Sequence, residues 1–162
     1  MGLDITAYRQ LKPAPDGVAV DDSGYPDDYK TYVLIRASTL EYSEEHFPGR
    51  SEGVIPGLFA FDEALPFRAG SYGGYNMWRA QLAELGGITK EGGLDEGKPF
   101  AELVWFSDCE GIIGPIVGAK LLKDFQDHLP QAEARGGYFL ESYKNWLKAF
   151  ELAADGGAVD FH

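Results

Sequence analysis

Two carboxylates separated by one residue form the most suggestive chemical group in the sequence. Asp108 and Glu110 belong to the segment Ser107–Gly111, which follows an apolar run. Carboxylates that converge in one tight loop can bind a divalent cation or serve as a general acid and a general base. The structural alternative is that they cap backbone N–H groups and stabilise a following helix N-terminus. We favour the structural reading, with Asp108 as the cap and Glu110 pointing out of the turn.

The single cysteine, Cys109, lies between these two carboxylates. A helix N-terminus can stabilise a reactive thiolate, but neighbouring carboxylates disfavour one, and no histidine is close in the sequence to act as a base. We therefore expect Cys109 to be a small buried side chain. Because one cysteine cannot form an internal disulfide, the expected compartment is the reducing interior of a cell.

A second candidate segment, residues 67–79, is rich in glycine and precedes a predicted helix. Backbone N–H groups in such a turn can hold an anion, with Arg79 available to help, and Tyr72 can stack on a ligand ring. The spacing matches neither a Walker loop nor a dinucleotide fingerprint, and aromatic residues at helical spacing are more often part of a core. The candidate ligand or partner surface comprises Ser71, Tyr72, Arg79, Ser107, Asp108 and Glu110.

The remaining residues capable of chemistry form no recognised motif. His46, His128 and His162 are far apart, so the helical zinc motif is absent, and no G-x-S-x-G sequence marks a nucleophilic serine. The sequence predicts neither a metal site nor a cofactor, and it names no catalytic residue.

Apolar patterning predicts the elements that must position these residues. Period-two alternation or short apolar runs indicate strands at 3–9, 17–20, 32–35, 58–61, 100–106 and 158–161. Helical spacing indicates helices at 75–85, 115–129 and 138–154, and the proline-bearing residues 38–68 are expected to be an irregular insertion. The fold class is therefore α+β: one domain over residues 1–162, with a mostly antiparallel or mixed sheet of four to six short strands and about three helices.

Charge restricts the classes of partner. The chain has 162 residues and a net charge of -12, from 26 acidic against 14 basic residues. This balance disfavours direct binding to nucleic acid or to an anionic membrane, and it favours a partner protein with a basic surface. Acidity for solubility alone is the simpler alternative. The N-terminal residues do not resemble a secretory signal and no apolar run is long enough to span a membrane, so we expect a cytoplasmic protein of unknown oligomeric state.

Four blocks of sequence together carry a resemblance to a known group of proteins. They are residues 1–5, residues 68–79, residues 106–115 together with 119–125, and residues 153–162, which include Arg68-Ala-Gly-Ser-Tyr-Gly-Gly-Tyr-Asn-Met-Trp-Arg79 and Phe106-Ser-Asp-Cys-Glu-Gly-Ile-Ile-Gly-Pro115. In combination they resemble small uncharacterised proteins of tailed bacteriophages and prophages. The resemblance implies a phage origin and action inside the host cell, but it supplies no activity and no site residues.

Two functions of different classes follow. The favoured one is a non-enzymatic acidic protein that binds a host or phage protein, for example as an inhibitor of a host nuclease or defence complex. The alternative is a small-ligand-binding protein or enzyme, with a site where the 71–79 turn meets the 107–114 loop. A concave pocket that holds Tyr72, Arg79, Asp108 and Glu110 together would favour the second function.

Overall fold

The larger of two sheets forms the centre of the molecule. In a computed structural model, which describes residues 2–89 and 97–162, this antiparallel sheet has the order β5–β1–β7–β6. Its strands are β1 (Gly2–Arg9), β5 (Glu63–Ser71), β6 (Gly111–Ile113) and β7 (Ala158–Phe161). Alternate residues of β1 point to opposite faces, so Leu3, Ile5 and Ala7 are buried on one face while polar residues occupy the other.

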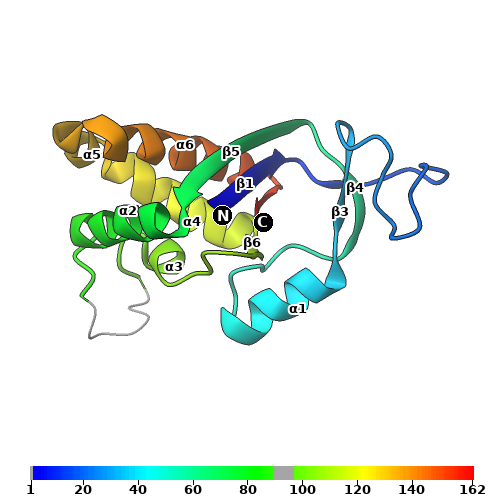
Figure 1. The fold of residues 1–162 in the computed structure, drawn as a ribbon, viewed down its shortest axis with the longest axis horizontal. Coiled ribbons are helices and arrows are strands. Elements are labelled where there is room, and N and C mark those ends of the chain that lie inside the picture. The colour runs from blue at the N-terminus through cyan, green and yellow to red at the C-terminus, as the bar shows by residue number, and fades with distance from the viewer. Residues whose placement is uncertain (1, 90–96) are drawn as a thin grey trace.

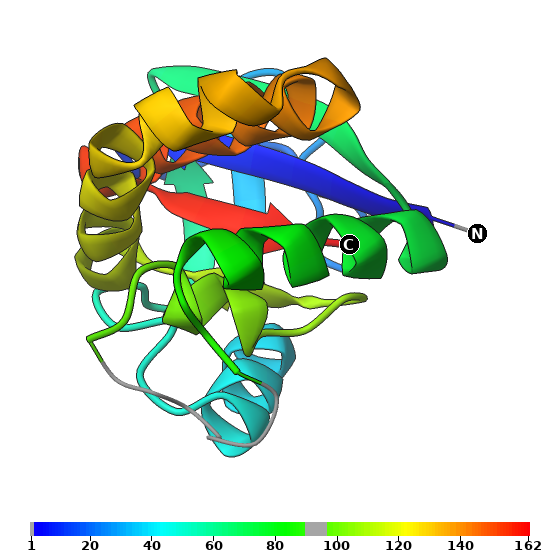
Figure 2. The same ribbon diagram turned by 90° about the vertical axis from the view of Figure 1, so that its left-hand side faces the viewer.

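Helices cover the apolar face of this sheet, and Figures 1 and 2 show them gathered at one end of the molecule. They are α2 (Tyr72–Leu85), α3 (Ala101–Val104), α4 (Pro115–Asp127), α5 (Leu129–Arg135) and α6 (Gly137–Ala154). Aromatic rings fill the interface: Trp146 of α6 contacts Trp78 at 5.9 Å and Phe67 at 5.3 Å between ring centroids. Burying each such ring stabilises the fold by about 1.5–3 kcal/mol.

The second sheet lies at the opposite end, beyond the tips of β1 and β5 (Figure 1). It comprises β2 (Lys12–Pro13), β3 (Tyr32–Ile35) and β4 (Gly57–Ala60) in the antiparallel order β2–β4–β3. Helix α1 (Ala37–His46) follows β3 and packs against β6, where the buried Ser43 Oγ accepts a hydrogen bond of 2.9 Å from the Ile112 N–H. A small apolar cluster that includes Ile35, Phe59 and Ile112 joins the two sheets.

The predicted fold class is confirmed, because the structure is α+β with antiparallel sheets. Seven strands and six helices occur among the described residues, which is more of each than expected. Strands β1, β3, β4 and β7 and helices α2, α4 and α6 lie where the patterning predicts them. Strand β7, although it lies at the end of the sequence, is an inner strand of the sheet, between β1 and β6.

Three local predictions are wrong. The apolar run 100–106 is not a strand: it holds the short helix α3, preceded by Phe100 with a left-handed φ of 66°, and the strand is β6 at 111–113. A short apolar run that is buried on every side has no periodicity that separates strand from helix. Residues 38–68 are not an irregular insertion, since they hold most of α1, all of β4 and part of β5. Residues 17–20 supply only an isolated bridge from Val20 to Pro26.

Candidate functional site

The two predicted segments do meet, through a hydrogen-bonded network centred on Asn76. Its Nδ2 donates to Asp108 Oδ2 at 2.8 Å, and Arg79 donates to Asn76 Oδ1 and, at 2.5 Å, to the carbonyl oxygen of Phe106. The Arg79 guanidinium also lies over the Tyr75 ring, 4.8 Å from its centroid. With these donors and acceptors engaged internally, Arg79 and Asp108 fasten α2 to the loop before β6.

The remaining residues of the first segment also have structural roles. The Ser71 hydroxyl accepts a hydrogen bond of 3.0 Å from the Gly74 N–H and so caps the N-terminus of α2. Tyr72 is partly buried and packs against the main apolar core. Neither side chain lines the large cleft described below.

The cap of the 107–110 turn is Ser107, not Asp108 as predicted. The buried Ser107 Oγ accepts hydrogen bonds from the backbone N–H groups of Cys109 at 3.2 Å and Glu110 at 3.1 Å. Asp108 is directed to Asn76 instead, because helix α2 lies beside the turn and offers an amide donor. The two carboxylates therefore do not converge on a shared partner: Asp108 faces α2, whereas Glu110 lines the cleft.

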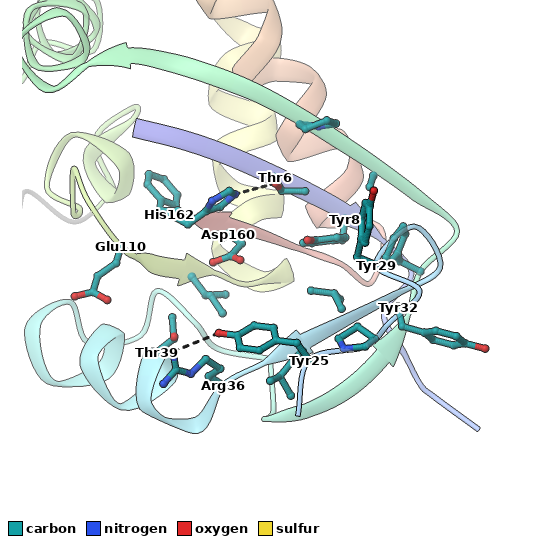
Figure 3. Close-up of a pocket in the computed structure, with 18 of the residues that line it drawn as sticks. Thr6, Tyr8, Tyr25, Tyr29, Tyr32, Arg36, Thr39, Glu110, Asp160 and His162 are labelled. Carbon is teal, nitrogen blue, oxygen red and sulfur yellow. Dashed lines mark hydrogen bonds between the residues drawn. The ribbon is translucent and has the colours of Figure 1, made fainter. Parts of the chain in front are cut away.

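That cleft, about 900 Å³ in volume, separates the large sheet from β3 and its preceding loop (Figure 3). Its floor follows from the strand register, which aligns Thr6 of β1 with Pro66 on one side and Asp160 of β7 on the other, and Asp160 with Ile112 of β6. Because side chains alternate along a strand, Thr6 and Asp160 share the face that is turned away from the helices. The polar face of the sheet thus becomes the floor of a cavity.

Asp160 is the chemically unusual group of this floor. Burial raises the pKa of its carboxyl from 3.8 to about 7. Neither a hydrogen bond nor an ion pair links the Asp160 carboxyl to any other side chain in the described part of the chain. Burial raises the pKa of the neighbouring Tyr8, and the negative charge of Asp160 adds to this effect. A carboxyl of this kind can donate or accept a proton near neutral pH, and it has free capacity to bind a ligand.

A second polar pair lies beside Asp160. Thr6 Oγ1 and His162 Nε2 form a hydrogen bond of 3.0 Å, which orients the imidazole at the edge of the cleft (Figure 3). Cys109 also lines the cleft and is exposed, so the expectation of a buried thiol is wrong. The capped turn that follows Ser107 holds both Cys109 and Glu110 at this surface.

The facing wall is aromatic. It comes from the loop before β3, from β3 and from the start of α1, and its main side chains are Tyr25, Tyr29, Tyr32, Arg36 and Thr39. Arg36 Nη1 donates to the Tyr25 hydroxyl at 3.4 Å. The loop is shaped by its aspartates, since Asp21 Oδ1 accepts from the backbone N–H of Ser23 at 2.8 Å and of Tyr25 at 3.0 Å.

Sequence reasoning found Glu110 but missed most of the cleft. For Asp160 and His162 a signal was present, because Ala158–Phe161 is an apolar strand interrupted by one aspartate, and such a polar residue must point away from the core. For the tyrosine wall there was none, because the contact between the loop of residues 21–31 and the large sheet is set by tertiary structure.

No metal cluster or membrane-spanning helix is found among the described residues, and no similar protein points to a different site. In residues 2–89 and 97–162, no cluster of three or more His, Cys, Asp or Glu side chains is arranged to hold a metal ion. None of the helices there is long and apolar enough to cross a membrane. Comparison of the chain with protein-family models, curated proteins and solved structures finds no match.

Proposed function

We propose that this protein binds a small organic molecule in the cleft between its two sheets. The observation that carries this proposal is the composition of the cleft: a volume of about 900 Å³ lined by tyrosines, with an unpartnered carboxyl, a threonine–imidazole pair and a guanidinium around it. Concave sites with apolar or aromatic walls and a few convergent polar groups are the usual form of small-molecule sites. The site differs from the predicted one, since it takes Glu110 from the candidate set and leaves Tyr72, Arg79 and Asp108 outside.

A fragment screen by NMR tests this function. Fragments with one aromatic ring should shift the backbone amide resonances of Thr6, Glu110 and Asp160, which belong to three different segments of the cleft. Thr39→Trp should abolish these shifts, because its indole would occupy the cleft. Ala134→Trp, an exposed change on α5, is the matched control and should leave binding intact. Fragment shifts that avoid the cleft, or that survive Thr39→Trp unchanged, would contradict the proposal.

A second candidate function keeps the favoured prediction from the sequence, a phage accessory protein that binds a basic protein of the host or phage. One observation favours it: residues 10–63 hold 11 acidic against four basic residues, and Asp21, Asp22, Asp27 and Asp28 of the loop and Glu41, Glu44 and Glu45 of α1 are all exposed. Exposed negative charge accelerates association with a basic surface.

The test for this second function uses a partner purified from host lysate by the wild-type protein. Glutamine at positions 41, 44 and 45 should lower the association rate, and rising salt should reduce the wild-type rate toward that of the variant. Glutamine at the exposed Glu133 and Glu141 and at the partly exposed Glu151 removes the same charge elsewhere and is the control. Equal effects of the two triple variants would argue against this surface.

A further inference from the structure

The charges of the cleft select among ligands, and this inference rests on the proposed function. Two carboxylates line the cavity, Glu110 and Asp160, whereas Arg36 is the one guanidinium or ammonium group among its described lining residues. Arg36 is already engaged with the Tyr25 hydroxyl on the facing wall. The surrounding protein carries a net charge of -12, so its field attracts cations into the cleft and repels anions from it.

The preference for cations should be strongest at the floor of the cleft, where Asp160 lies. Its carboxylate points into the cavity, with Tyr25 on the facing wall and Tyr8 and Tyr29 toward one end (Figure 3). A ligand that enters beside Asp160 therefore meets a carboxylate below it and phenol rings around it. Tyrosine rings attract cations through the negative faces of their π systems, and such contacts strengthen when the cation leaves water.

We propose that the cleft is a site for an organic cation, a protonated amine or amidine attached to a ring, whose charge is bound by the Asp160 carboxylate. The ring takes the tyrosine-lined part of the cavity, and Glu110 supplies a second negative charge. Binding of the cation supplies the ion pair that Asp160 otherwise lacks. It also favours the ionised carboxylate, so it should release a proton from any fraction of Asp160 that is protonated.

Several titratable or charged groups line the cleft with Asp160 and can affect how cation binding depends on pH. They are Tyr8 from β1, Tyr25, Tyr29 and Tyr32 from the loop and β3, Arg36 before α1, Cys109 and Glu110 from the turn, and His162. An imidazole changes its charge near neutral pH, and a charged one would also repel a cation. The experiment must therefore separate His162 from Asp160.

Three probes of similar shape and different charge test the ligand class. Phenethylamine is a cation, phenethyl alcohol is neutral and hydrocinnamate is an anion. Titrations followed by the amide shifts of Thr6, Glu110 and Asp160 should give the order cation, then neutral, then anion. At about pH 8, Asp160→Asn should weaken phenethylamine binding roughly tenfold and leave the alcohol unchanged, as expected when one ion pair is lost. Glu133→Gln, an exposed carboxylate on α5, is the control and should change neither.

The pH dependence gives an independent readout. If the cation binds only the ionised carboxylate, its affinity should fall from pH 8 to pH 6, by up to about tenfold, which is the full effect for an Asp160 pKa of about 7. The fall should persist in His162→Gln and disappear in Asp160→Asn. A fall that disappears in His162→Gln alone would overturn the role of Asp160.

The outcomes distinguish the two proposals. If the alcohol or the anion binds the cleft as tightly as the amine, the cation inference is wrong while the small-molecule function stands. If none of the three probes moves the cleft resonances and a wider fragment screen finds no ligand there, both are wrong. If Asp160→Asn proves unfolded, Asp160→Glu takes its place, because it keeps the charge and shifts its position. The order of affinity of the three probes should then change. An unchanged order would overturn the inference.

Discussion

Replacing Asp160 by asparagine should change how the stability of the protein depends on pH. Burial raises the pKa of this carboxyl from 3.8 to about 7, so between these values the folded state holds a proton that the unfolded state has lost. Stability falls with rising pH wherever the folded state binds more protons. Asp160 therefore lowers the free energy of unfolding progressively from about pH 4 to pH 7, and it has its full cost above that range.

The magnitude follows from the same shift. A difference between 3.8 and about 7 corresponds to about 4 kcal/mol in the free energy of unfolding. Because the cleft is open to water and Asp160 is only partly buried, solvent screening reduces this figure, and we expect about 2 kcal/mol. Asparagine has nearly the same shape and no charge. Asp160→Asn should therefore match the wild type near pH 4 and be about 2 kcal/mol more stable near pH 8.

Urea denaturation of both proteins from pH 4 to pH 8 measures this difference. The quantity of interest is the variant minus the wild type, because other titrating groups contribute equally to both. At about 2–4 °C per kcal/mol for a chain of this size, the melting temperature of the variant should be roughly 4–8 °C higher at pH 8. Asp16→Asn, an exposed aspartate, is the control and should give a flat difference. A flat difference for Asp160→Asn, or one that grows toward low pH, would refute the reasoning.

Three further predictions concern the elements that build the site. Ser107→Ala should lower the free energy of unfolding by about 1–2 kcal/mol, because two backbone N–H groups lose their acceptor. Glu110→Ala should change it by less than about 0.5 kcal/mol, because this side chain is exposed. Urea denaturation of the two variants measures both values. Gly157→Ala should prevent stable folding, since its Cβ would lie 1.7 Å from the carbonyl oxygen of Tyr8, and circular dichroism with thermal melting would show this. Cys109 should react with a thiol reagent in the native protein, and a thiol that resists labelling would contradict its exposed position. Adding a reductant should change the melting temperature by less than about 1 °C, as measured by differential scanning fluorimetry.

The long elements could be predicted from the sequence because each carries a strong local pattern. Strand β1 alternates buried Leu3, Ile5 and Ala7 with more exposed residues, and α6 places Tyr143, Trp146 and Phe150 on one buried face. Proline marks both boundaries of α4: Pro115 lies in its first turn, and Pro130 follows soon after its last residue, in the first turn of α5. In these places local preference and tertiary packing agree, so pattern and structure coincide.

The short elements could not be predicted for the opposite reason. Strand β6 has three residues, all buried, and it pairs only because β7 offers an open edge. Helix α3 has four residues, and contacts from elsewhere in the chain set its start, since the Phe100 N–H donates to Asp124 Oδ2 of α4 at 3.0 Å. Segments this short contain no more than two periods of either pattern, so tertiary contacts decide their structure.

The candidate site lies where those short elements meet. Its floor is formed by the polar face of β1 and β7. The sequence predicts that these positions are polar, but it does not predict which segment lies over them. Part of its wall is an acidic loop in which Asp21 accepts hydrogen bonds from the nearby backbone, and this loop places Tyr25 across the cleft from Asp160 and Tyr29 toward one end of the cleft. The acidic loop that suggests a partner protein and the carboxyl that suggests a small cation therefore lie on two sides of the same cleft. A cation bound at Asp160 would lower the negative charge beneath the acidic loop, so its effect on the association rate of a basic partner would show how far the two functions are coupled.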